Sequence, residues 1–304
     1  MTPQAHPRFG LPSPTRIALL GRGATTVWDS GVCDSGPDTE TNHAPLLLLH
    51  GWNIDAPTNF GYAFGALAAT RRVVMFDHHG HGDGVRPSSR FELADAAQDA
   101  LGVLDHLGID RAVIVGYSMG GAIAQLLAHG SPDRCAGLVL MATADKFSDS
   151  RRDRRQFAVF STSARMLDAM PSGARARAFD RIAGAACKKY PSWILETVKR
   201  ADPVALLEAG ASLGKFDSSG WNANLAVPVA FVYTSRDSVV PPRRQIRLAN
   251  ALGVVHMHSV DADHDLPIRN DPRFTRAILK TVAAVDDPDA ASSWWLPSSV
   301  DAAH

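Results

Sequence analysis

Residues 112–130 read AVIVGYSMGGAIAQLLAHG. The first four are small or β-branched apolar residues, as in a buried strand, and the stretch after the serine has the composition of a helix. A tight turn, Gly116-Tyr117-Ser118-Met119-Gly120, therefore joins a strand directly to a helix. Such a turn lifts the serine hydroxyl above the end of a sheet, and its crowded backbone requires glycine. Ser118 is accordingly the first candidate for a nucleophile.

A second stretch has the same G-x-S-x-G letters at residues 210–214, with Ser212 at its centre. A helical pattern precedes it and a turn follows it, so it lacks the strand-to-helix setting that would expose a hydroxyl. Ser212 is therefore a weak candidate. The alternative for Ser118 itself is a plain glycine-rich turn without chemistry.

Short apolar runs alternate with helical stretches on both sides of this turn. Strands are expected at 16–20, 25–28, 46–49, 73–76, 112–115, 138–141, 229–233 and 254–260, and helices at 60–69, 91–107, 118–129, 242–251 and 272–282. This alternation predicts an α/β protein with a mostly parallel sheet covered by helices on both faces. The tail over 286–304 is expected to be irregular.

The alternation stops over residues 144–220, which contain helical stretches with arginine-rich faces and no convincing strand. We predict a helical cap there, inserted between two parts of one core, 1–143 and 221–304. The large apolar residues of the cap suit either an apolar acyl or aryl group or the cap's own core: Phe157, Phe160, Met166, Met170, Phe179 and Trp193.

A serine hydroxyl becomes a good nucleophile only when a base removes its proton, and a histidine held by a carboxylate is the usual solution. Asp237 follows the expected strand at 229–233, and His264 follows the one at 254–260. The carboxyl ends of parallel strands lie at one edge of a sheet, so these side chains are expected near Ser118. Asp145, after the strand at 138–141, is the alternative acid.

The remaining acids and histidines of this region have plainer interpretations. Asp261, Asp263 and Asp265 are too near His264 in sequence to orient it easily, and they are expected to form a solvated loop. His256 and His258 fall within a strand and are expected to be packed or edge residues.

Acyl transfer also requires hydrogen-bond donors for the developing oxyanion. The backbone N–H of Met119, directly after the serine, is one candidate. The second is the backbone N–H of Trp52, in the His50-Gly51-Trp52 loop that follows the strand at 46–49.

Taken together, HGW (50–52), DHHGHGDG (77–84), GYSMGG (116–121), the late Asp237 and the late His264 resemble the α/β-hydrolase fold superfamily over residues 15–285. The closest likeness is to its capped esterase, lipase and C–C-hydrolase branch. The resemblance implies an eight-stranded sheet and a helical lid after the sixth strand.

Carried over to the matching positions, the resemblance implies a nucleophile at Ser118, an acid at Asp237, a base at His264, and oxyanion donors at Trp52 and Met119. Relatives similar to epoxide hydrolases and haloalkane dehalogenases have aspartate in place of Ser118, so their chemistry is not expected. The leading expectation is a cofactor-free serine hydrolase of a small or medium-chain apolar carboxylic ester. Cleavage of a C–C bond in a diketo-acid by the same residues is the alternative.

Two alternative functions, a metal-dependent hydrolase and a non-catalytic binding protein, stay open. His79-x-His81-x-Asp83 is similar to a metallo-hydrolase ligand pattern, but the next position is Gly84 where that pattern has histidine. The second interpretation is a binding protein that has lost its chemistry, and turnover of any simple ester would exclude it.

The composition limits which partners and cellular locations are expected. The 31 basic and 31 acidic residues give a formal net charge of zero, which argues against nucleic-acid binding. Three cysteines at wide spacing fit no disulfide framework, and no apolar run has the length of a signal peptide or membrane span. We expect a cytoplasmic protein with a small-molecule ester substrate; the oligomeric state is left open, with a homodimer among the alternatives.

Overall fold

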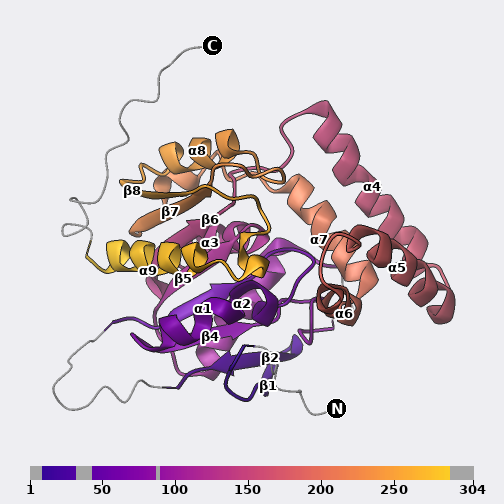
Figure 1. Ribbon diagram of the computed structural model, residues 1–304, viewed down its shortest axis with the longest axis horizontal. Helices are drawn as coiled ribbons and strands as arrows, with labels where there is room; N and C mark the ends of the chain where they lie inside the picture. The colour runs from indigo at the N-terminus through magenta and orange to yellow at the C-terminus, as the bar shows by residue number, and fades with distance from the viewer. Residues whose placement is uncertain (1–8, 32–42, 87–89, 288–304) are drawn as a thin grey trace.

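The computed structural model describes residues 9–31, 43–86 and 90–287 (Figure 1). The strands of its sheet are β1 (Thr15–Leu19), β2 (Gly23–Asp29), β3 (Leu46–Leu49), β4 (Val73–Phe76), β5 (Ala112–Tyr117), β6 (Cys135–Met141), β7 (Val229–Thr234) and β8 (His256–Val260). Their order is β1-β2-β4-β3-β5-β6-β7-β8; β2 pairs antiparallel with both β1 and β4, and all other neighbouring strands pair in parallel. The expected eight-stranded, mostly parallel sheet is confirmed.

Helices cover both faces of this sheet, as expected for α/β topology. Five of them flank the sheet: α1 (Ala56–Ala68), α2 (Leu93–His106), α3 (Met119–Gly130), α8 (Pro242–Ala251) and α9 (Pro272–Asp286). Successive side chains of a strand point to opposite faces. Leu46 and Leu48 of β3 consequently pack with α1 and α9, whereas Leu47 and Leu49 pack with α2, α3 and α8. Both faces are buried, which explains why the strands are continuously apolar.

The loops after several strands converge at one edge of the sheet. Leu49 pairs with Gly116, and Met141 pairs with both Tyr117 and Val232, so β3, β5, β6 and β7 end at nearly the same level. Candidate site residues distant in sequence are thereby delivered to one region.

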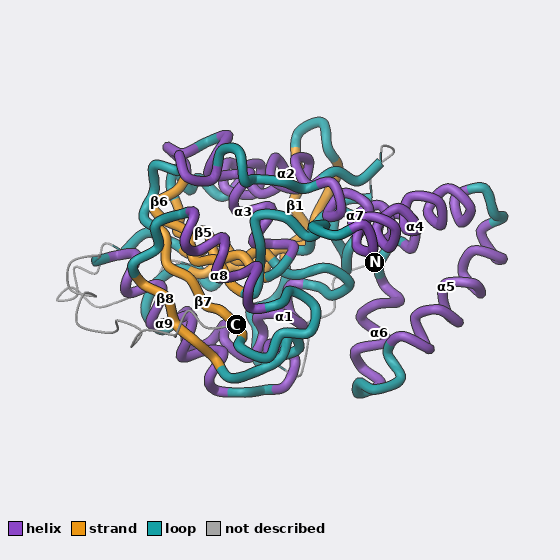
Figure 2. Tube along the Cα trace, turned by 90° about the horizontal axis from the view of Figure 1, so that it is seen from above, coloured by secondary structure: helices purple, strands orange, loops and turns teal. Residues whose placement is uncertain are grey.

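Four helices connect β6 to β7 in the region where a cap is expected. They are α4 (Arg151–Asp168), α5 (Ser172–Ala186), α6 (Ser192–Arg200) and α7 (Pro203–Lys215). We call residues 151–215 the α4–α7 segment. Its two ends meet at the sheet, where Lys146 and Asp217 form an antiparallel bridge and the Ser218 N–H donates to the Asp145 carbonyl (2.8 Å). The two views place α4 and α5 farthest from the sheet (Figures 1 and 2).

Ion pairs fasten the beginning of this segment to α8. Arg247 donates to Asp145 and Asp149, and Arg244 donates to Asp149 and Asp153. Asp153 also closes a capping box with Ser150 at the first turn of α4. Since Arg244 is buried, loss of both carboxylates would leave its charge without compensation in the interior.

The element boundaries differ from the expected ones mainly at helix ends. Helix α1 begins at Ala56, four residues early, because Asp55 accepts a hydrogen bond from the Thr58 N–H and Pro57 suits the first helical turn. Helix α9 continues to Asp286, past the expected end. The tail prediction otherwise lies outside the described residues. Within the described ranges, no helix combines the length and apolarity that crossing a bilayer requires.

The turn at Ser118 depends on close backbone approach at Gly120. A Cβ there would lie 1.9 Å from the Leu49 carbonyl oxygen, so backbone would have to move. We predict that Gly120→Ala lowers the free energy of unfolding by about 1–3 kcal/mol, measured by urea denaturation. The matched control is Gly130→Ala in the same helix, where a Cβ meets nothing within 4 Å and stability should not fall. Equal destabilisation by both would contradict the prediction.

Candidate functional site

Ser118 occupies a strained turn between β5 and α3. Its backbone has φ 54° and ψ −113°, a conformation that non-glycine residues rarely adopt. The Ser118 N–H donates to the Met141 carbonyl (2.9 Å), and the Thr143 hydroxyl donates to the Ser118 carbonyl (2.8 Å). Both polar groups of the strained residue are therefore paired with the end of β6 or the residues after it. Strain persists where the surroundings over-determine the conformation, and such positions are often functional.

The structure brings Ser118, His264 and Asp237 together. His264 Nε2 lies 3.0 Å from Ser118 Oγ, and His264 Nδ1 lies 2.8 Å from Asp237 Oδ2. The side chain of Asp237 is fully buried and that of His264 is 18% exposed. These three residues follow β5, β7 and β8, in the chain order serine, acid, histidine.

Asp237 is held by four hydrogen bonds in addition to that of His264. The Thr234 hydroxyl (2.6 Å) and the Gln245 amide (3.1 Å) donate to Oδ2. The backbone N–H groups of Val239 (2.9 Å) and Val240 (2.7 Å) donate to Oδ1. These four donors fix the orientation of the carboxyl group towards the imidazole. Thr234 and Gln245 carry no motif that could have identified them in the sequence.

Asp263 lies in a partly exposed loop, as expected, and it also ties the loop of Asp237 to the loop of His264. Its Oδ1 accepts from the backbone N–H of Ser238 (2.8 Å) and of His264 (2.7 Å). Partial burial works to raise the pKa of Asp263, but these hydrogen bonds outweigh it and lower the pKa below its usual value. The one feature of the sequence that pointed to this role is that Asp263 directly precedes His264.

Tyr117 supports His264 from the opposite direction. Its hydroxyl donates to the His264 carbonyl (2.9 Å), and burial raises the pKa of this phenol well above its usual value. The hydroxyl therefore stays protonated and remains a donor at any physiological pH.

Asp145, the alternative acid, is engaged elsewhere. Arg247 makes a bidentate contact with it, with Nε 3.0 Å from Oδ2 and Nη2 2.5 Å from Oδ1. Asp261 and Asp265 pair with the exposed Arg236 and Arg269, as surface carboxylates do.

Of the two expected oxyanion donors, Met119 directly follows Ser118 in the turn and Trp52 lies in the loop that packs beside it. Within the described residues, neither the Trp52 nor the Met119 backbone N–H has an acceptor. A Cβ on Gly51 would lie 3.6 Å from Ser118 Cβ, so the Trp52 loop packs directly against the serine. Unpaired N–H groups in such a place are available to a developing negative charge.

The histidine-rich loop is buried beneath this region. Asp83 pairs with Arg200 of α6 (3.2 Å), while His79 and His81 pack against Phe91. Among the described residues, no three His, Cys, Asp or Glu side chains are arranged to hold a metal ion. Burial lowers the pKa of His81 to about 3 and the pKa of the neighbouring His50 to about 4.

Two buried carboxylates lie beside that loop. Asp55 pairs with Arg200, and Asp77 accepts from the backbone N–H groups of Ala56 (2.9 Å) and Asp83 (2.7 Å). Burial, and secondarily the charge of Asp55, raise the pKa of Asp77 to about 8. Arg200 thereby ties the end of α6 to the core.

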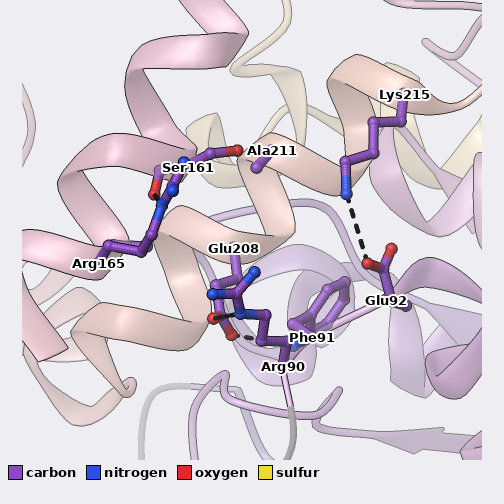
Figure 3. Close-up of a pocket in the computed structure, with 9 residues that line it drawn as sticks. Arg90, Phe91, Glu92, Ser161, Arg165, Glu208, Ala211 and Lys215 are labelled. Carbon is purple, nitrogen blue, oxygen red and sulfur yellow. Dashed lines mark hydrogen bonds and ion pairs between the residues drawn. The ribbon is translucent and has the colours of Figure 1, made fainter.

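Ser212, at the second G-x-S-x-G, has a structural role. Its hydroxyl accepts from the Leu93 N–H (3.1 Å) and donates to Glu92 (2.9 Å), which fixes α7 to the start of α2. Figure 3 shows the adjacent pocket, where Glu208 and Lys215 of α7 face the chain at residues 90–92. The glycines of this motif serve helix packing, since Gly214 lies against Phe157.

The large apolar residues of the α4–α7 segment have different surroundings. Phe160 packs on Trp52, whereas Phe179 and Trp193 join a small apolar cluster of the segment itself. Met166 and Met170 are 61% and 37% exposed, so the interpretation as core residues of the cap is wrong for them.

Comparisons with known proteins agree with this architecture. The family model for the alpha/beta hydrolase fold matches residues 44–169. An esterase from Thermogutta terrifontis has a TM-score of 0.69 at 23% identity, covering 90% of this chain and 99% of the esterase. The chain has the α/β-hydrolase fold.

Most of the curated relatives align with only part of the chain. It is 41% identical over 103 residues to 2-hydroxymuconate semialdehyde hydrolase from Pseudomonas sp. (strain CF600), covering 33% of this chain and 36% of that protein. The chain thus spans about a third of that relative's length. It is 28% identical over 268 residues to the magnesium-chelatase 30 kDa subunit of Rhodobacter capsulatus, covering 83% and 89% of the two chains.

The buried histidines make stability depend on pH. An unfolded histidine protonates near 6.5, whereas folded His81 stays neutral down to about 3. Its contribution is therefore fully present above pH 6.5 and is lost as the pH falls towards 3, at about 1.4 kcal/mol per unit. We predict that unfolding free energy falls between pH 7 and pH 5 in urea titrations, and that His81→Asn reduces this fall by about 2 kcal/mol. An unchanged fall in the variant would show that His81 is not buried and neutral.

Proposed function

We propose that this protein is a serine hydrolase that cleaves a carboxylic ester through an acyl-enzyme. The observation that carries the proposal is the pair of contacts from His264, 3.0 Å to Ser118 Oγ and 2.8 Å to Asp237 Oδ2. A hydroxyl, an imidazole and a buried carboxylate in this chain of contacts form the arrangement that activates a serine.

The contact with Asp237 sets the tautomer of His264. Asp237 can only accept, so His264 Nδ1 carries the proton and the Nε2 lone pair faces Ser118. Proton transfer from Ser118 to Nε2 accompanies attack of Oγ on the ester carbonyl carbon. The imidazolium that forms is stabilised by the Asp237 carboxylate.

The carbonyl π electrons move onto oxygen as Ser118 attacks, and the Trp52 and Met119 backbone N–H groups stabilise that charge by donating to it. Collapse of the tetrahedral species breaks the bond to the alkoxy group, which takes the proton from His264 Nε2 and leaves as the alcohol. Water then attacks the acyl-serine in the same way and releases the acid. No step of this sequence requires a cofactor.

The substrate we propose is a small or medium-chain apolar ester. Trp52 follows the glycine that contacts Ser118, and its ring meets Phe160 of α4 edge-on, with centroids 5.0 Å apart. These two rings offer apolar surface beside the nucleophile. We further propose that residues 144–220 form a cap on a core made of 1–143 and 221–304.

Cleavage of a C–C bond in a diketo-acid is the second candidate, favoured by the 41% identity to 2-hydroxymuconate semialdehyde hydrolase over 103 residues. The leaving group is then a carbon acid, and the same triad serves. We place either reaction in the cytoplasm, and the buried free thiols of Cys135 and Cys187 are consistent with a reducing compartment.

The nucleophile assignment is tested by labelling. A serine-directed organophosphate should add one equivalent per chain in intact-mass measurements, and Ser118→Ala should abolish both labelling and turnover of nitrophenyl esters. Ser212→Ala is the matched control, because Ser212 bonds to Glu92 and should stay unlabelled. Labelling that persists in Ser118→Ala and disappears in Ser212→Ala would reject the assignment.

The same assay separates the candidate reactions. Nitrophenyl esters of increasing chain length are compared with aryl diketo-acids, and the ester proposal predicts the higher kcat/KM for esters beyond acetyl. A clear preference for the diketo-acids would favour the C–C hydrolase.

The acid is tested by exchanging each carboxylate for its amide. Asp237→Asn should lower kcat by about 10³–10⁴, since an amide no longer holds the productive tautomer or stabilises the imidazolium. Asp145→Asn breaks the contact with Arg247 and should lower kcat less than about tenfold, with a loss of stability instead. Circular dichroism checks folding of both variants, and a reversed order of effects would make Asp145 the acid.

A further inference from the structure

The side chain of Trp52 is held by two helices of the α4–α7 segment. Its indole Nε1–H donates to the Leu206 carbonyl of α7 (2.8 Å), and its ring packs edge-on against Phe160 of α4. Gly210, one turn beyond Leu206, leaves the space for it: a Cβ there would lie 2.7 Å from Trp52 Cζ2. The indole is thus fixed by a directional hydrogen bond and by packing from two sides.

The main chain of the same residue belongs to the loop beside Ser118. On the core side, this loop is held where the Gly51 N–H donates to the buried Asn59 side chain (2.8 Å). After Trp52 the backbone turns sharply, with φ 68° at Asn53. The contacts of the Trp52 indole therefore restrain the middle of a short, sharply turned loop between β3 and α1.

Helix α7 is a firm support for this contact. Its Glu208 accepts from the Phe91 N–H (2.9 Å), and its Ser212 accepts from the Leu93 N–H (3.1 Å). The Asp202 N–H, at its start, donates to the Gly80 carbonyl (2.8 Å). These three bonds attach α7 to the core along its length, so Trp52 rests on a fixed element.

We propose that Trp52 is a positioning residue through which helices α4 and α7 set the direction of the oxyanion-binding N–H. The inference rests on the proposed function, because it assigns to the Trp52 side chain control over the Trp52 backbone donor used in that reaction. Hydrogen-bond strength falls steeply with misalignment, and the oxyanion forms only in the transition state. Loosening the indole should therefore lower kcat more than it raises KM.

The test compares Trp52→Phe, Gly210→Ala and Gly214→Ala. Phenylalanine at position 52 keeps an aromatic ring but cannot donate to Leu206, and the methyl group added by Gly210→Ala would push on the indole. Gly214→Ala is the matched control, since its Cβ would press on Phe157 (2.3 Å) on the same face of α7 without touching Trp52. We expect kcat for a nitrophenyl ester to fall about 10–100-fold in the first two, with KM within about threefold. In Gly214→Ala, kcat should stay within about threefold of wild type.

A trifluoromethyl ketone of matching chain length supplies a readout independent of turnover. It forms a hemiketal anion with a serine, so its inhibition constant should weaken in Trp52→Phe in parallel with kcat, while that of the corresponding alcohol should not. In the double variant of Trp52→Phe and Gly210→Ala, phenylalanine lacks the ring atoms that the added methyl group would meet, so the two effects should not add.

Wild-type kcat in Trp52→Phe and Gly210→Ala, or an equal loss in Gly214→Ala, would overturn the positioning role and leave the proposed hydrolase intact. Absence of Ser118-dependent turnover and labelling in the wild-type protein would reject the proposed function, and this inference with it.

Discussion

Strand β5 passes into α3 with no linker between them, and Ser118 absorbs the whole change of direction. Its φ of 54° and ψ of −113° are tolerated because Met141 and Thr143 pair both of its backbone polar groups. The turn also brings α3 so close to the end of β3 that Gly120 has no room for a side chain. That close approach sets the hydroxyl, the Met119 N–H and the 50–52 loop side by side.

The remaining partners arrive on loops, which are intrinsically less rigid than strands. Asp263 joins the loop of Asp237 to the loop of His264, and Tyr117 anchors His264 to the end of β5. Gln245 adds a contact from α8 to Asp237. Ser118, Asp237 and His264 are thus each held by neighbours from other elements, an arrangement that preorganises their side chains.

The α4–α7 segment is attached to the core through charge as well as apolar packing. Arg244 and Arg247 hold its beginning, and Arg200 reaches the buried Asp55 near the middle. Buried ion pairs add little net stability, but breaking one leaves an uncompensated charge, so they favour one docked arrangement over others. The contact between Trp52 and α7 links that arrangement to the loop beside the serine.

The sequence alone predicts the order of strands and helices and the position of Ser118 in a strand-to-helix turn. Both predictions rest on local patterns, the alternation of apolar runs and G-x-S-x-G between a strand and a helix. The sequence also placed Asp237 and His264 at strand ends, but it left Asp145 open as the acid. Three features come from the three-dimensional arrangement alone. Asp145 is ion-paired with Arg247, and Asp263 joins two loops through hydrogen bonds. Met166 and Met170 are exposed. These outcomes depend on pairs of residues about 25 to 150 positions apart or on which face of a helix meets a neighbour, and local patterns carry no record of either.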